Sequence, residues 1–122
     1  MPGRVLIVLP DPDRVSAISI ALAAAGADSL HVPTVDEALR VIDQAEIGAV
    51  VVDIHLPRTS ALVLAQRLRA RSNGRHVVAI ALTRIDTPDV RRIARDAGYD
   101  ECLPDTTPPR EIATAIFEGA RR

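Results

Sequence analysis

The chain alternates between short apolar runs and segments with helical periodicity. Apolar runs at 5–9, 47–52 and 77–82, the second broken only by Gly48, are typical of strands buried on both faces of a sheet. Weaker strand patterns lie at 29–32 and 101–103. The pattern therefore predicts five strands with helices between and after them.

The helical segments have recognisable ends. Gly26 and Gly98 suit the left-handed position after the first and fourth helices. We expect the third helix to begin near Ser60 and its arginines at 67, 69 and 71 to point largely outward. Residues that cap or start a helix precede the second, fourth and fifth helices: Thr34 in a capping box with Glu37, Thr87 followed by Pro88, and Pro108 with Pro109.

Strands that alternate with helices predict an α/β fold with a parallel sheet and right-handed crossovers. The 122 residues are 48% hydrophobic, which suits one domain spanning 1–122. In such a doubly wound sheet, ligands and chemistry gather at the carboxyl ends of the strands. Candidate functional residues are therefore those that directly follow each apolar run.

Composition excludes several function classes. All fifteen basic residues are arginine, so Schiff-base chemistry and a phosphate-loop lysine are excluded. The net charge of −1, with Tyr99 and Phe117 as the only aromatic residues, argues against a nucleic-acid partner. A single cysteine, Cys102, excludes an internal disulfide and a cysteine-rich zinc site.

No targeting segment is visible, and every apolar run is shorter than the roughly 20 residues of a membrane span. We therefore expect a soluble cytoplasmic protein with no membrane partner.

Polar residues follow the predicted strands. Asp53 follows the third predicted strand and Thr83 the fourth, while Asp11 and Asp105 lie just beyond the first and fifth strands. A desolvated carboxylate at the end of a buried strand costs several kcal/mol unless it is paired or exposed in a cleft. Asp53 is therefore the leading candidate for a functional side chain.

Four segments, in order, resemble the receiver domain of response regulators in two-component signalling. They are Arg4-Val5-Leu6-Ile7-Val8, Val51-Val52-Asp53-Ile54-His55-Leu56-Pro57, Ala79-Ile80-Ala81-Leu82-Thr83 and Ala97-Gly98-Tyr99-Asp100. The resemblance implies a CheY-like, flavodoxin-like (βα)5 fold with strand order 2-1-3-4-5. It also implies a signalling module rather than an enzyme, with Asp53 accepting a phosphoryl group from a histidine kinase and Thr83 hydrogen-bonding that group.

The sequence departs from the family pattern at the positions that supply positive charge and readout. The family's two metal-binding acids align with Leu9 and Pro10, its lysine with Asp105, the proline after that lysine with Thr106, and its aromatic switch residue with Cys102. The Mg²⁺ that the family uses would keep only Asp11, Asp53 and the backbone carbonyl of His55 as ligands.

An acid in place of the lysine should repel Asp53 and oppose the arrival of a phosphoryl group. We therefore expect an arginine, Arg84 first and Arg58 second, to pair with Asp53 in place of the missing cation. His55 is expected to be an exposed loop side chain rather than a metal ligand.

Three functions stay open at this point. The first is a degenerate receiver that acts as a protein-interaction module, with phosphorylation impaired or absent. The second is a working receiver that is phosphorylated on Asp53 with help from Asp11. The third is a small-ligand-binding domain, because Asp53-Ile54-His55 resembles part of the Asp-x-His-x-x-Gly loop of cobalamin-binding domains, with Arg58 at the glycine position.

The expected partners are a histidine kinase or another signalling protein. In the receiver family, the face made by the fourth helix, fifth strand and fifth helix carries dimer and partner contacts. A homodimer through that face is therefore a further expectation.

Overall fold

The computed structural model describes residues 3–55, 58–71 and 76–120, with the side chains of 58 and 59 left out. Its ten elements alternate strictly between strand and helix. They are β1 (Arg4–Val8), α1 (Pro12–Ala24), β2 (Ser29–Val32), α2 (Val35–Gln44), β3 (Ile47–Asp53), α3 (Arg58–Ala70), β4 (Val78–Thr83), α4 (Pro88–Ala97), β5 (Glu101–Pro104) and α5 (Pro109–Ala120). The predicted strands are confirmed to within one residue at each end.

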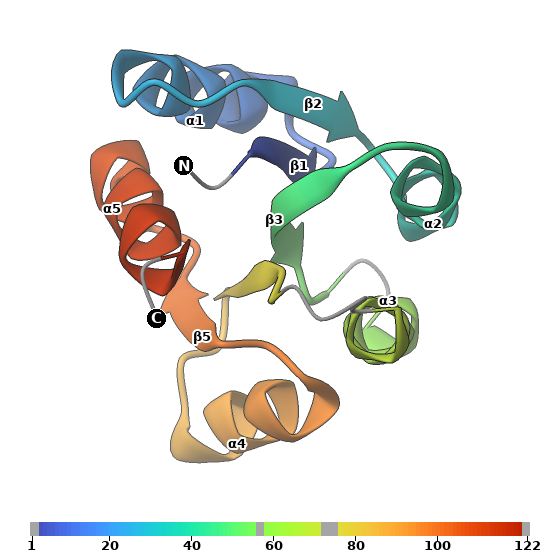
Figure 1. Ribbon diagram of the computed structural model, residues 1–122. Coiled ribbons are helices and arrows are strands. Elements are labelled where there is room, and N and C mark those ends of the chain that lie inside the picture. The colour runs from blue at the N-terminus through green and yellow to red at the C-terminus, as the bar shows by residue number, and fades with distance from the viewer. Residues whose placement is uncertain (1–2, 56–57, 72–75, 121–122) are drawn as a thin grey trace.

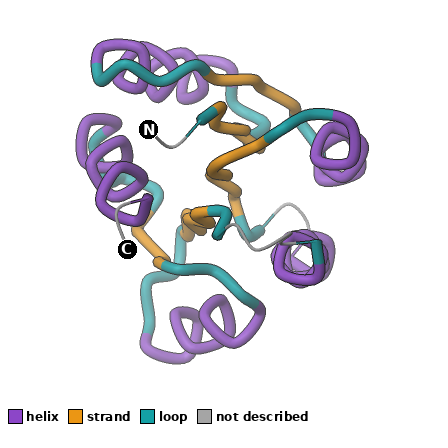
Figure 2. The backbone as a smooth tube through the Cα atoms, viewed as in Figure 1, coloured by secondary structure: helices purple, strands orange, loops and turns teal. Residues whose placement is uncertain are grey.

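The strands form one parallel sheet in the order β2-β1-β3-β4-β5. Helices α1 and α5 lie side by side on one face, and α2, α3 and α4 cover the other (Figure 1). The loops that follow the strands gather at one edge of the sheet (Figure 2). This arrangement confirms the doubly wound, flavodoxin-like fold.

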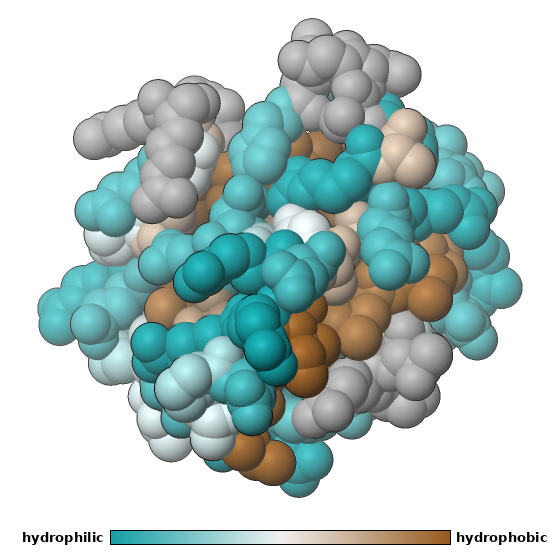
Figure 3. Space-filling view, turned by 90° about the horizontal axis from the view of Figure 1, so that it is seen from below, coloured by the Kyte–Doolittle hydropathy of each residue, from teal (hydrophilic) through white to brown (hydrophobic). Residues whose placement is uncertain are grey.

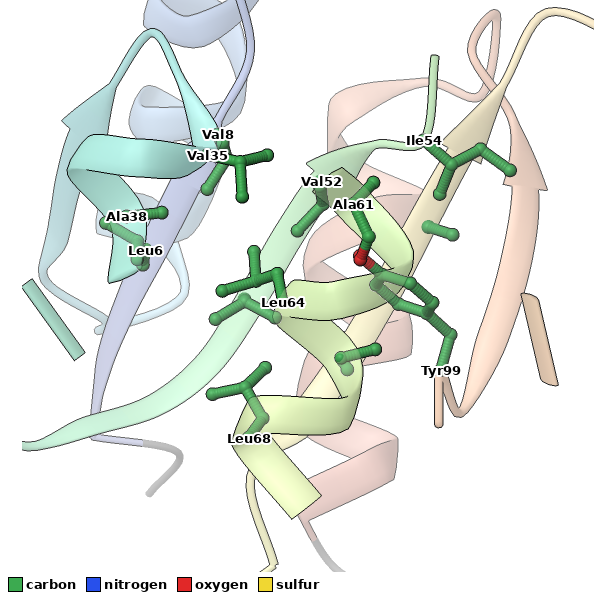
Figure 4. Packing of buried hydrophobic residues seen from close by; sticks show 14 of the residues in the cluster. Leu6, Val8, Val35, Ala38, Val52, Ile54, Ala61, Leu64, Leu68 and Tyr99 are labelled. Atoms are coloured by element: carbon green, nitrogen blue, oxygen red, sulfur yellow. The ribbon is translucent and has the colours of Figure 1, made fainter. Parts of the chain in front are cut away.

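The central strands are apolar throughout because helices cover both of their faces. In β1, Leu6 and Val8 pack with α2 and α3, whereas Val5 and Ile7 pack with α1 and α5. Figure 4 shows side chains from β1, β3, α2 and α3 pointing toward one another in the first of these layers. The four β1 side chains, Val5, Leu6, Ile7 and Val8, are fully buried.

The Thr34 and Thr87 caps form as predicted. The Thr34 hydroxyl accepts from the backbone N–H of Glu37 at 3.3 Å, and the Thr87 hydroxyl accepts from that of Val90 at 3.2 Å. Gly98 ends α4 with a φ of 125°, a backbone conformation that residues with a Cβ rarely adopt. Local sequence thus determines where these helices begin and end.

Tyr99 joins α3 to the turn before β5. Its ring is 2% exposed and its hydroxyl donates a 2.7 Å hydrogen bond to the backbone carbonyl of Ala61 (Figure 4). Burial raises the pKa of the phenol well above its ordinary value. The residue is therefore a neutral, hydrogen-bonded part of the core.

Arg69 does not point outward, contrary to the prediction. Its guanidinium donates to the carbonyls of Gly98 (2.6 and 2.8 Å) and Val77 (2.7 Å) and forms an ion pair with Asp100 at 3.0 Å. Asp100 also accepts from the backbone N–H of Ala79 at 2.7 Å. The arginine satisfies backbone groups where α3, β4 and the turn before β5 meet, which helical periodicity alone does not reveal.

Gly119 allows α5 to lie close to β4. A Cβ at this position would lie 2.7 Å from Val78 Cγ1 and 3.2 Å from Val78 Cγ2, distances that force a shift of the buried valine. We expect Gly119→Ala to lower the free energy of unfolding by about 1–2 kcal/mol, since overpacking outweighs the better helix propensity of alanine. Urea unfolding followed by circular dichroism measures this loss.

A second-site variant provides the control. Val78→Ala removes the two methyl groups that a new Cβ would meet. In that background, Gly119→Ala should be neutral or stabilising. The same loss in both backgrounds would contradict close packing against Val78 as the cause.

Within the described residues, no helix has the length and apolar character that a membrane crossing requires.

Candidate functional site

The polar residues singled out from the sequence lie at the carboxyl edge of the sheet. Asp53 is in register with Leu82, and Thr83 with Pro104, so the two residues end neighbouring strands. Backbone hydrogen bonds continue beyond the strands: Ile54 N–H donates to Leu82 O at 3.1 Å, and Asp105 N–H donates to Thr83 O at 2.8 Å. The ends of β3, β4 and β5 are thereby held together.

Asp53 is half-buried and turns back on its own loop. Its Oδ1 accepts from the backbone N–H of His55 at 2.8 Å. Arg84 is exposed, and no ion pair joins it to Asp53 in the described part of the chain. The Arg58 side chain, the second expected partner, lies outside the described residues, as do Leu56 and Pro57.

Thr83 is 1% exposed and its hydroxyl makes three contacts. It accepts from Ile85 N–H at 3.0 Å, donates to Ile85 O at 2.9 Å and lies 2.9 Å from Nε2 of His55. His55 is half-buried, whereas it was predicted to be exposed. The loop after β3 directs its imidazole to the end of β4. The spacing of the three residues in the sequence gives no sign of this contact.

Leu9 and Pro10 are the two residues that the sequence resemblance was expected to align with the family's acid pair. Leu9 is 4% exposed, and its carbonyl receives a 3.0 Å hydrogen bond from Nε2 of His31. Pro10 is exposed. The Asp11 carboxylate caps α1 by accepting from the backbone N–H of Asp13 at 3.0 Å.

The donor set at this edge does not fit a divalent cation. Mg²⁺ prefers several oxygen ligands in octahedral geometry. Among the described residues, no group of three or more His, Cys, Asp or Glu side chains could hold a metal ion. Asp11 and the Asp53 Oδ1 atom are each engaged by backbone N–H groups instead.

An arginine that the sequence did not single out reaches the loop after β5. Nη2 of Arg14, in the first turn of α1, donates to the backbone carbonyls of Asp105 and Thr107, the latter at 2.8 Å. Asp105 is half-buried and Thr106 is exposed. Because the contact joins residues 91 and 93 positions apart, no local pattern could have indicated it.

Cys102 lies half-buried on β5, beside α4 and the buried cluster beneath it. Burial, and secondly the Asp86 carboxylate, raise the pKa of its thiol. Asp86 in turn makes a bidentate ion pair with Arg91, with N–O distances of 2.6 and 2.8 Å. These hydrogen bonds lower the pKa of the Asp86 carboxyl. The surroundings disfavour a reactive thiolate, in agreement with a packing role for Cys102.

The side of the molecule that carries α4 is mainly hydrophilic, with smaller apolar areas between the polar side chains (Figure 3). A groove at the start of α4 is lined by Asp86, Thr87, Pro88, Arg91, Arg92 and Arg95. Ile85, just before it, is a large apolar residue that is 52% exposed.

Comparisons with known proteins agree with the fold. The chain is 28% identical over 112 residues to an uncharacterized 14.6 kDa protein of Leptolyngbya boryana, covering 92% of this chain and 86% of that protein. It is 26% identical to the phosphate regulon transcriptional regulatory protein PhoB of Pseudomonas aeruginosa, covering 100% of this chain and 54% of that protein. The chain thus spans about half the length of the PhoB relative.

Solved structures superpose over nearly the whole chain. A putative response regulator from Chloroflexus aurantiacus gives a TM-score of 0.87 at 22% identity, covering 100% of both chains. The orphan response regulator HP1043 of H. pylori gives a TM-score of 0.86 at 16% identity, covering 98% of this chain and 97% of that one. Residues 5–117 match the sequence model of the response regulator receiver domain. The chain therefore belongs to the response regulator receiver family of two-component signalling, whose members are signalling modules.

Proposed function

We propose that this receiver domain works mainly as a protein-interaction module and that phosphoryl transfer to Asp53 is impaired or absent. The observation that carries the proposal is that, among the described residues, the edge around Asp53 holds no set of acidic side chains able to bind a divalent cation. The acid-pair positions are Leu9 and Pro10, and the lysine position is Asp105.

The chemistry of the transfer explains why these positions matter. When a carboxylate attacks a phosphoryl group, two anions meet, and fixed positive charge must stabilise the transition state. Asp105 adds a negative charge to the same edge of the sheet. Arg14 brings a guanidinium to the loop after β5, where it binds two backbone carbonyls. No lysine is available from any element, because the chain contains none.

The proposed interaction surface is the face made by α4, β5 and α5, which fits a signalling protein, a histidine kinase or a second copy of this chain. An exposed apolar residue, Ile85, lies beside exposed charged side chains of α4. Two ion pairs, Arg91 with Asp86 and Arg92 with Asp89, order part of this surface. For this role we propose a cytoplasmic location.

The alternative is a receiver that still accepts a phosphoryl group on Asp53. It is favoured by the position of Asp53 at the end of β3, directly beside the strand that ends in Thr83. No described contact favours the small-ligand function: Asp53 Oδ1 accepts from the His55 backbone N–H, and the His55 ring lies against Thr83.

Incubation with acetyl phosphate and Mg²⁺, followed by intact-mass measurement, separates these functions. We expect the wild-type chain to stay unmodified, as should Asp53→Asn, the matched control. A gain of one phosphoryl group that Asp53→Asn abolishes would establish the alternative instead.

A further inference from the structure

We propose that the His55 side chain is a latch that closes the Thr83 hydroxyl to an oxyanion at Asp53. This inference deepens the proposed function, since it rests on Asp53 and Thr83 forming the phosphoryl site. It concerns a different obstacle from the missing acids: a side chain of the protein itself occupies the position that an incoming anion needs.

The hydrogen-bonding capacity of the hydroxyl supports the latch. A threonine hydroxyl has one proton to donate and two lone pairs. The hydroxyl donates its proton to Ile85 O. One lone pair accepts from the Ile85 N–H, and the other faces His55 Nε2. Nε2 must then carry a hydrogen and act as the donor. No capacity of the hydroxyl remains for a phosphoryl oxygen.

The three contacts are not equivalent. Both bonds to Ile85 are local, because that residue lies two positions along the same turn. His55 reaches Thr83 from another strand end, 28 residues away, and comes within 2.9 Å. A phosphoryl oxygen cannot share that position with Nε2. When the imidazole leaves, the position is vacated and the hydroxyl proton can turn toward it.

The loop holds the imidazole in place. Asp53 Oδ1 accepts from the His55 backbone N–H at 2.8 Å, which fixes the backbone of the residue that carries the ring. Thr83 is 1% exposed, so little water competes for its hydroxyl. The acceptor carboxylate and the latch are therefore coupled: a ligand that draws Asp53 away from the His55 amide also loosens the ring from Thr83.

The first test measures the contact without any phosphorylation. In the ¹⁵N-labelled chain at pH 8, we expect His55 to be a single Nε2–H tautomer. Thr83→Val should shift the His55 ring nitrogen signals toward a mixture of tautomers, and Thr83→Ser should restore the wild-type signals. The ring of His31, which donates to Leu9 O, is the internal control and should not change. His55 signals that are the same in wild type and Thr83→Val would overturn the proposal.

The second test measures the consequence. With acetyl phosphate and Mg²⁺, His55→Ala should take up phosphoryl groups on Asp53 about fivefold faster than wild type, the gain expected from removing one competing hydrogen bond. The increase should vanish in the Thr83→Val background. If wild type is modified and His55→Ala is no faster, the latch is overturned.

The outcomes separate the two proposals. Modification of wild type contradicts the proposed function, whereas the tautomer comparison still decides the latch. If neither wild type nor His55→Ala is modified, the proposed function stands and the tautomer comparison alone supports or overturns the latch.

Discussion

Asp100→Ala is expected to lower the free energy of unfolding by about 2–3 kcal/mol. One carboxylate oxygen of Asp100 accepts from Ala79 N–H at 2.7 Å and pairs with Arg69 at 3.0 Å, and the other lies 2.8 Å from His76 Nε2. The substitution removes the acceptor of the Ala79 N–H and the carboxylate that pairs with Arg69. The partial exposure of the Arg69 and Asp100 side chains, 26% and 21%, keeps the loss below that of a fully buried pair.

Urea unfolding followed by circular dichroism measures the loss, and Asp89→Ala is the matched control. Asp89 forms an ion pair with Arg92 at 3.3 Å, but its side chain is 83% exposed. An exposed pair of this kind contributes about 0.5 kcal/mol or less. Equal losses in the two variants would show that the Asp100 cluster does not hold α3, β4 and β5 together.

Asp105→Lys is expected to make phosphoryl transfer from acetyl phosphate to Asp53 detectable at low ionic strength, at a rate about tenfold or more above any residual wild-type rate. Strands β3 and β5 are separated by β4 alone, which places their ends about 10 Å apart. Reversing a charge at that distance, with an effective dielectric constant of about 40, changes the interaction by about 1.5 kcal/mol. The longer lysine side chain can also approach Asp53 more closely.

The matched control is Asp105→Asn, which removes the negative charge and keeps the size of the side chain. It should give an intermediate rate, and added salt should reduce the effect of both substitutions. Intact-mass measurement over time gives the rates. If Asp105→Lys and Asp105→Asn leave the rate at the wild-type level, the charge at this position is not what limits the transfer.

The fold could be predicted from the sequence because its strongest signals are local. Continuous apolar runs indicated β1, β3 and β4, since strands covered on both faces need no alternation. Thr34, Thr87 and Gly98 marked helix ends through bonds and backbone angles that reach no further than three residues. Asp53 and Thr83 were found because they follow such runs, and the topology then brings their strands together.

Other parts of the fold and of the site depend on contacts between distant residues. Arg69 was expected outward from helical periodicity, yet backbone carbonyls 8 and 29 residues away receive its guanidinium. Arg14 reaches across more than 90 residues to the loop after β5. His55 was expected to be an exposed loop side chain because neither His31 nor His76 stands at a metal-ligand spacing from it. Its partner lies at the end of the next strand. Side chains whose roles are set by tertiary contacts leave no periodic signal.

We propose that Asp53 lies at a receiver edge without the charges that phosphoryl transfer needs. Intact-mass measurement of the wild-type chain after incubation with acetyl phosphate and Mg²⁺ tests it most directly. We predict an unmodified mass for wild type and for Asp53→Asn alike. A stable gain of one phosphoryl group in wild type, absent from Asp53→Asn, would contradict the claim.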